Sequence, residues 1–180
     1  DLSARHGLPH RADGSPCNPD FIVVGYGKLG GLELGYGSDL DLVFIHDAAP
    51  DGETDGQRPL DNASFFARLG QKMIAFLTAA TSAGLLYEVD MRLRPSGNSG
   101  LLVSSLKSFT NYQDEKAWTW EHQALVRARV VAGDTRLAGA FDAERHAVLA
   151  RSRDLATLRQ EVREMRDKMR GHLSSEAPGK

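Results

Sequence analysis

A glycine-rich segment between two short apolar runs constrains the fold more than any other feature of this sequence. Six of the residues between 25 and 37 are glycines, and apolar runs at Phe21–Gly25 and Leu40–His46 flank them. Apolar runs of this length that end at glycines are typical of buried strands. Because glycine destabilises helices, the connection has room for only a short one. The sequence therefore predicts two strands joined by a tight connection.

The glycine motif itself, GYGKLG at residues 25–30, has three interpretations. It matches the G-x-G-x-x-G pattern of a dinucleotide-binding crossover, which also follows a strand. That crossover needs a dozen or more residues, mostly helical, before the next parallel strand, but only about ten residues separate Gly30 from Leu40. A bare turn is the second interpretation. We favour the third, a phosphate-binding loop, because glycines let backbone N–H groups approach a phosphate and Lys28 adds a positive charge.

Two aspartates mark the start of the second predicted strand. Asp39 and Asp41 stand two residues apart, so their side chains project from the same face of that strand. A later strand, predicted over Leu85–Arg94, alternates apolar and ionisable residues from Tyr87 onward and carries Asp90 on its charged face. If the two strands are neighbours, three carboxylates converge beside the glycine loop; otherwise they are unrelated surface charges. Crowded carboxylates raise each other's pKa values, and a hard cation such as Mg²⁺ relieves their repulsion.

This set of residues predicts chemistry at a phosphorus atom. Two Mg²⁺ ions held by the three carboxylates can bind a nucleoside triphosphate and stabilise an in-line displacement that releases pyrophosphate. Asp90 is the residue expected to take the proton from an attacking hydroxyl. Five further residues are expected to bind the nucleotide through backbone N–H groups, a hydroxyl or a positive charge: Gly27, Lys28, Ser38, Arg92 and Arg94.

The remainder of the chain is predicted to be mainly helical. A helix is expected from a cap at Asp61 or Asn62 to Gly84, with an apolar side made of Phe65, Phe66, Leu69, Met73, Phe76, Leu77 and Ala80. Residues 95–100 predict a turn, and residues 101–103 the returning strand of a hairpin. Further helices are predicted over 105–112, 115–126 and 135–150, with a strand at 126–131. A last helix carries an apolar stripe of Leu155, Leu158, Val162, Met165, Met169 and Leu173.

Composition limits the classes of function. The 180 residues include 22 Lys and Arg against 24 Asp and Glu, a formal net charge of −2. No general positive field is available to hold nucleic acid, and no apolar run approaches the length of a membrane helix. The single cysteine, Cys17, excludes an internal disulfide framework and fits a reducing compartment. We therefore expect a cytoplasmic protein with no nucleic-acid or membrane partner.

Several motifs together carry a family resemblance. Gly27-Lys28, then Ser38-Asp39-x-Asp41 and a later strand aspartate, resemble the pattern of the polymerase-beta-type nucleotidyltransferase superfamily. More closely, the chain resembles the glutamine synthetase adenylyltransferase family, in four blocks: GYGKLGG (25–31), ELGY (33–36), VDMRLRPSG (89–97) and WTWEHQALVRAR (118–129). The first and last blocks are similar to the C-terminal, adenylylating half of these bifunctional bacterial regulators.

The resemblance implies an α+β fold of the polymerase-beta type, a mixed sheet with flanking helices and an additional C-terminal helix. Residues 1–20 are polar and rich in glycine and proline, and this composition predicts a linker. The resemblance then implies a nucleotidyltransferase domain over 21–150 and the start of a truncated helical region over 151–180. It implies that Asp39, Asp41 and Asp90 are catalytic metal ligands, with Mg²⁺ as cofactor and ATP as substrate. The implied reaction transfers AMP to a tyrosine hydroxyl of glutamine synthetase and regulates nitrogen assimilation.

The implied partners are glutamine synthetase, a PII-type nitrogen regulatory protein and other domains of the same chain. Two alternatives stay open: the de-adenylylating, phosphorolytic half of the same enzyme, and a non-catalytic nucleotide-sensing module. Roles for individual residues of the last block are open too. Core packing is the favoured interpretation for Trp118, whereas His122 packs in the core or shapes a pocket. Arg127 and Arg129 are either ion-pair partners or phosphate contacts.

Overall fold

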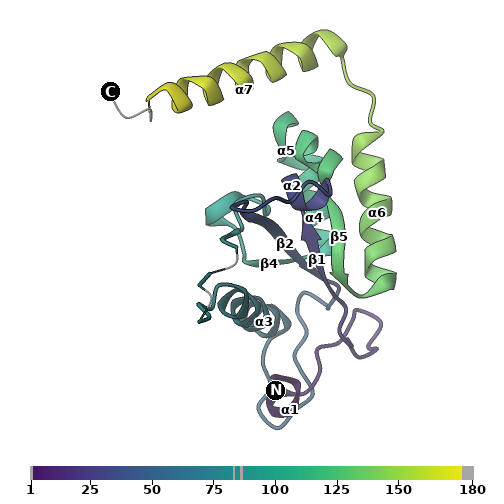
Figure 1. Ribbon diagram of the computed structural model, residues 1–180. Coiled ribbons are helices and arrows are strands. Elements are labelled where there is room, and N and C mark those ends of the chain that lie inside the picture. The colour runs from purple at the N-terminus through teal and green to yellow at the C-terminus, as the bar shows by residue number, and fades with distance from the viewer. Residues whose placement is uncertain (1, 83, 86, 176–180) are drawn as a thin grey trace.

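The computed structural model describes residues 2–82, 84–85 and 87–175, which form a mixed sheet covered by helices (Figure 1). The helices are α1 (Leu2–His6), α2 (Gly27–Gly30), α3 (Asn62–Leu77), α4 (Leu106–Glu115), α5 (Thr119–Ala124), α6 (Thr135–Leu149) and α7 (Leu155–Ser175). The strands are β1 (Phe21–Gly25), β2 (Leu40–His46), β3 (Val89–Asp90), β4 (Val103–Ser105) and β5 (Arg129–Gly133). Two 3-10 turns, η1 (Gly97–Ser99) and η2 (Leu125–Arg127), complete the described elements, and the α+β prediction is confirmed.

The sheet has the strand order β3-β2-β1-β5, and β4 also pairs with β2. β1 is antiparallel to both β2 and β5, whereas β3 and β4 are parallel to β2. β3 pairs with the first residues of β2, and β4 pairs with its last residues. The two short strands therefore lie one after the other along β2. The dinucleotide-binding interpretation of the glycine motif is therefore wrong, because that crossover joins parallel strands and β1 and β2 are antiparallel.

Both faces of the sheet are buried. On one face, Phe21, Val23, Leu42 and Phe44 pack with Phe65 and Phe66 of α3. On the other, Ile22, Val24, Val43 and Ile45 pack with Phe109 of α4 and Phe141 of α6. Alternate residues of β1 and β2 belong to different clusters, as the two-residue period of a strand requires. Figure 1 shows α3 and α6 on opposite sides of the sheet.

Side-chain caps fix the starts of the main helices. The Asp61 carboxylate accepts a hydrogen bond from the backbone N–H of Ser64 at 2.7 Å, and this confirms the predicted start of α3. The predicted end of α3 is wrong, since the helix ends at Leu77 and not at Gly84. The Thr78 hydroxyl donates to the Ile74 carbonyl at 2.8 Å, and Phe76 is 82% exposed, so a longer helix would have no apolar surface to cover. Ala83, within the predicted helix, lies outside the described residues.

The strand predicted over Leu85–Arg94 is much shorter in the structure, where only Val89 and Asp90 pair with β2; Leu86 lies outside the described residues. The chain turns immediately afterwards, because the backbone N–H of Arg94 donates to the Met91 carbonyl at 3.3 Å. The predicted hairpin is wrong as well, since β4 runs parallel to β2 and does not return along β3. The parallel pairing of β4 with β2 is favoured because it buries Val103 in the apolar cluster between the sheet and α3.

Residues 2–20 pack against the domain, although the sequence predicts a linker there. His6, Cys17 and Asp20 are buried. The Asp20 carboxylate accepts hydrogen bonds from Arg11 at 2.5 Å and from Arg136 at 2.8 Å, which connects the segment to the start of α6. The division into domains stays a prediction, but residues 2–20 are not a free tether.

The last helix, α7, extends away from the sheet and contacts α5 (Figure 1). The Thr119 hydroxyl of α5 donates a hydrogen bond to the Glu161 carboxylate of α7. Along the predicted stripe, Leu158, Val162 and Met165 are half-buried and Leu155 is exposed; the side chains of Met169 and Leu173 lie outside the described part. Within the described residues no helix is both long and apolar enough to cross a membrane.

Candidate functional site

Three carboxylates meet where β2 and β3 begin to pair. Asp41 lies in β2 directly opposite Asp90 in β3, and Asp39 precedes the first residue of β2. One carboxylate oxygen from each of Asp39, Asp41 and Asp90 lies within 4.8 Å of the others. The structure thus brings together the three residues that the sequence predicts as metal ligands, through the strand neighbourhood that the prediction required.

The environment of the three carboxylates separates their acidities. Burial, followed by the negative charges of Asp39 and Asp90, raises the pKa of Asp41. The pKa of Asp90 is lowered instead, mainly because it accepts hydrogen bonds from Arg92. At neutral pH the cluster therefore contains one carboxylate that is already neutralised by an arginine and one that is destabilised by its neighbours.

Arg92 is the direct partner of Asp90. Its Nε and Nη2 atoms donate to Asp90 Oδ2 at 2.8 and 2.5 Å, and its backbone N–H donates to Oδ1 at 2.8 Å. The Arg92 side chain is otherwise largely exposed, so its guanidinium group can leave for another anion. Arg94 is used differently, since its Nη1 donates to the Met91 carbonyl at 2.6 Å.

Gly27 and Lys28 lie at the N-terminus of α2, next to the carboxylates. Gly27 has a φ of +52°, and a Cβ at this position would overlap Oδ2 of Asp41, so only glycine allows the backbone this close to that carboxylate. Lys28 is exposed and its Nζ lies 3.5 Å from Oγ of the buried Ser38. Three of the five predicted nucleotide-binding residues, Gly27, Lys28 and Ser38, therefore gather on one side of the carboxylate cluster.

The other glycines of the motif have a packing role. A Cβ on Gly30 would overlap the carbonyl oxygen of Arg127, and a Cβ on Gly31 would lie 2.7 Å from the Arg127 guanidinium group. Arg129 donates to the carbonyl oxygens of Leu29 and Gly30 at 3.1 and 3.2 Å. Gly30 of the motif and the adjacent Gly31 thus allow α2 to pack closely on the segment 127–129, whereas Gly27 faces the carboxylates.

These contacts bear on the arginines of the last sequence block. Arg127 forms an ion pair with Glu33, and Arg129 donates to two backbone carbonyls. Phosphate contact by either arginine stays a prediction. The favoured core position of Trp118 is wrong, because its side chain is 70% exposed. His122 bonds to the Gln113 carbonyl at 3.0 Å, which is a structural contact. The hydrogen-bonding role of Arg129 has no local sequence signal, since its partners lie about a hundred residues away.

The donor set fits a divalent cation of the hard, oxygen-preferring kind. Three carboxylate groups from two paired strands offer oxygen ligands at mutual distances that one or two such ions can span. Burial and then the negative charges of Asp39 and Asp90 raise the pKa of Asp41, and a bound cation would offset both effects. Beside this cluster, the exposed side chains of Lys28 and Arg92 provide positive charge for an anionic substrate. The arrangement suits the binding of a metal–phosphate complex.

Comparisons with known proteins agree with this geometry. A family model described as glutamate-ammonia ligase adenylyltransferase matches residues 1–144. Proteins named bifunctional glutamine synthetase adenylyltransferase/adenylyl-removing enzyme are similar throughout: that of Pseudomonas aeruginosa is 66% identical over 176 residues, and that of Thioalkalivibrio sulfidiphilus 61% over 181 residues. These matches cover 98% and 99% of this chain but only 18% and 19% of the relatives. The chain therefore spans about a fifth of the length of the curated relatives it matches.

Proposed function

Because the chain belongs to the glutamate-ammonia ligase adenylyltransferase family, we propose that it transfers AMP from ATP to a tyrosine hydroxyl of glutamine synthetase. The observation that carries this proposal is the convergence of Asp39, Asp41 and Asp90 within 4.8 Å, beside the Gly27–Lys28 backbone. Carboxylates so arranged suit the transfer of a nucleotidyl group better than the transfer of a hydride. The names of the relatives supply the protein substrate, and the carboxylates supply the type of reaction.

The triphosphate would be held by the cationic side of the site. Lys28, next to Ser38, is placed to neutralise phosphate oxygens, and the Gly27 backbone comes close enough to donate an N–H. Arg92 would exchange its bonds to Asp90 for bonds to the same phosphates, because a guanidinium group binds carboxylate and phosphate alike. Arg94 adds positive charge from a partly buried position.

The reaction forms a bond between the tyrosine oxygen and the α-phosphorus and breaks the bond from that phosphorus to the oxygen bridging it to the β-phosphate. Pyrophosphate leaves with the electron pair of the broken bond. Mg²⁺ held by Asp39, Asp41 and Asp90 would stabilise the negative charge that builds up on the phosphate oxygens. The proton of the tyrosine hydroxyl must pass to a base in the site.

Asp90 is the base that we propose. It is ionised at neutral pH, since the hydrogen bonds from Arg92 lower its pKa. The same hydrogen bonds make it a weak base, because a carboxylate with a lowered pKa binds a proton poorly. Departure of Arg92 to the phosphate oxygens would free the Asp90 oxygens that it occupies, so that they can take a cation or a proton.

The test is transfer of labelled AMP from ATP to purified glutamine synthetase, by this chain and by the same chain extended to the length of its relatives. We expect transfer that requires Mg²⁺ and is lost in Asp39→Asn and in Asp41→Asn, with thermal unfolding showing that both variants are folded. Full transfer by either variant would contradict the proposal. Release of label from adenylylated glutamine synthetase by phosphate, without any attachment, would instead assign the removing reaction to this chain.

A further inference from the structure

We propose that a cleft between α1 and α3 is a second binding site, and that it takes a small organic or inorganic polyanion. The cleft has a volume of about 650 Å³. Its lining residues come from two elements that are distant in the sequence: Leu2, Ala4, Arg5 and His6 from α1, and Arg68, Gln71, Lys72 and Ala75 from α3. Figure 1 shows α1 well apart from α2, so this cleft is separate from the carboxylate cluster.

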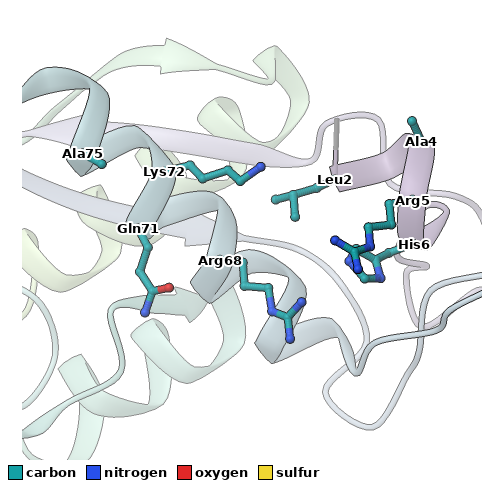
Figure 2. Close-up of a pocket in the computed structure, with 8 residues that line it drawn as sticks. All are labelled: Leu2, Ala4, Arg5, His6, Arg68, Gln71, Lys72 and Ala75. Carbon is teal, nitrogen blue, oxygen red and sulfur yellow. The ribbon is translucent and has the colours of Figure 1, made fainter. Parts of the chain in front are cut away.

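The charged side chains that line the cleft in the described part of the chain are all basic. Arg5, Arg68 and Lys72 line it, and no acidic residue of the described chain does. Figure 2 shows Lys72 extending from α3 toward α1 and Arg5 extending from α1 toward α3. Arg68 and Lys72 stand four residues apart, so they lie one turn apart on the same face of α3.

The three cations form no ion pair with any residue that the structure describes. None of the ion pairs found there involves Arg5, Arg68 or Lys72. Asp61 interacts electrostatically with Arg68 and keeps its negative charge while it accepts a hydrogen bond from Ser64, so it offsets part of the Arg68 charge. The positive charge that lines the two walls is therefore only partly offset by the described residues. An anion in the cleft would be attracted by the remaining positive charge.

The two walls of the cleft are held in place before any ligand arrives. Nδ1 of the buried His6 bonds to the Arg58 carbonyl at 2.7 Å, and the His6 carbonyl accepts from the backbone N–H of Gly56 at 2.9 Å. The backbone N–H of Leu8 donates to Asp55 at 2.7 Å. On the other wall, α3 is fixed to the sheet by its buried Phe65 and Phe66. Rigid walls lower the entropic cost of binding, because only the ends of the cationic side chains need to be ordered.

Size and chemistry define the ligand class. Sites for small molecules have volumes of roughly 300–1,000 Å³, so the cleft is large enough for a small molecule. Two guanidinium groups and an ammonium group match phosphate or carboxylate oxygens, and the charges on opposite walls require at least two negative charges on the ligand. Leu2, Ala4 and Ala75 also offer apolar contact. A polyphosphate or a polycarboxylate meets these requirements.

The test is calorimetric titration of the full chain with tripolyphosphate, citrate and acetate, in a buffer from which divalent metal ions have been removed with a chelating resin. We expect saturable binding of tripolyphosphate or citrate at a single site, with acetate binding much more weakly. Comparison of the first two distinguishes phosphate from carboxylate ligands. Arg68→Gln and Lys72→Gln should each weaken the binding about tenfold, because each removes one charge-assisted contact. Arg5→Gln, on the opposite wall, should do the same even if the α3 variants prove unstable.

Two control variants locate the binding. Arg163→Gln with Arg166→Gln removes two exposed cations from α7 and should leave the affinity unchanged. Lys28→Gln alters the proposed nucleotide site and detects any anion that binds there and not in the cleft. The proposal is overturned if no saturable binding occurs, or if the α7 control weakens binding as much as the cleft variants do. Loss of binding in Lys28→Gln with retention in the cleft variants would also overturn it, because the anion would then occupy the carboxylate region.

Discussion

Asp41 of β2 and Asp90 of β3 are register partners in a parallel strand pair, which places two carboxylates side by side at the point where the pairing begins. Pairing between these strands covers only two residues of each, and one of the two pairs is unfavourable on electrostatic grounds. Burial and the charges of Asp39 and Asp90 raise the pKa of Asp41 in consequence. Repulsion between carboxylates in a strand pair is expected at a site that binds a cation, because the cation offsets it.

The first prediction concerns stability with and without metal. Asp41→Asn should raise the free energy of unfolding by about 0.5–1 kcal/mol in EDTA at pH 7, because it removes the repulsion within the cluster. Added Mg²⁺ should stabilise the unaltered chain and have much less effect on the variant. Urea unfolding measures both quantities. Asp142→Asn, at an exposed position of α6, is the matched control, and an equal response of Asp41→Asn and the unaltered chain to Mg²⁺ would count against a metal site.

The second prediction concerns competition between Arg92 and a metal for Asp90. Arg92→Ala should increase the affinity for Mn²⁺, without nucleotide, by up to about fivefold, because an exposed ion pair contributes up to about 1 kcal/mol. Arg94→Ala also removes one positive charge but no hydrogen bond to Asp90. It therefore measures how much the loss of a nearby positive charge alone changes the Mn²⁺ affinity. Electron paramagnetic resonance reports free Mn²⁺ directly. Equal affinities in the two variants would show that Arg92 does not compete with the metal.

The third prediction compares a glycine that close packing requires with a glycine that has space for a side chain. Gly30→Ala should destabilise the chain by about 2–4 kcal/mol, because its Cβ would overlap the Arg127 carbonyl and push α2 away from η2. Gly35→Ala is the control within the same segment, since its Cβ would meet only Oγ of Ser38, at 4.0 Å. Thermal unfolding of both variants makes the comparison. Similar melting temperatures would mean that the close contact at Gly30 carries no stability.

The fourth prediction concerns pH. Burial lowers the pKa of His46 to about 4 from an ordinary value near 6.5. The unfolded chain therefore binds this proton more readily than the folded chain, so stability is complete above about pH 6.5 and falls as the pH decreases toward 4. The loss should reach about 3 kcal/mol, since the neutral ring accepts from the Ala48 N–H at 3.1 Å and stacks on Phe66.

Urea unfolding between pH 7 and 4.5 checks this loss. His46→Asn keeps a hydrogen-bond acceptor but does not titrate in that range, so its stability should change much less with pH. If the variant and the unaltered chain lose stability in parallel, another group is responsible.

Local sequence patterns are sufficient to predict much of the fold. The apolar runs ending at glycines predict β1 and β2, and the cap at Asp61 predicts the start of α3. The two-residue period of a strand is enough to place Asp39 and Asp41 on one face. Such features depend on backbone geometry and on neighbours within a few residues, so the sequence carries them directly. The alternation around Asp90 predicts a strand with Asp90 on its charged face, but the approach of Asp90 to the other two carboxylates required this strand to pair with β2.

The sequence by itself determined the glycine connection, the two central strands and the identity of the carboxylates. Only the tertiary structure decided that β3 shortens to two residues, that β4 runs parallel to β2, and that Gly30 serves packing against Arg127. The cationic cleft between α1 and α3 was also decided there, since its residues are distant in the chain and share no motif. The physical reason is that pairing and close packing depend on which distant surfaces bury each other, and burial is a property of the whole chain.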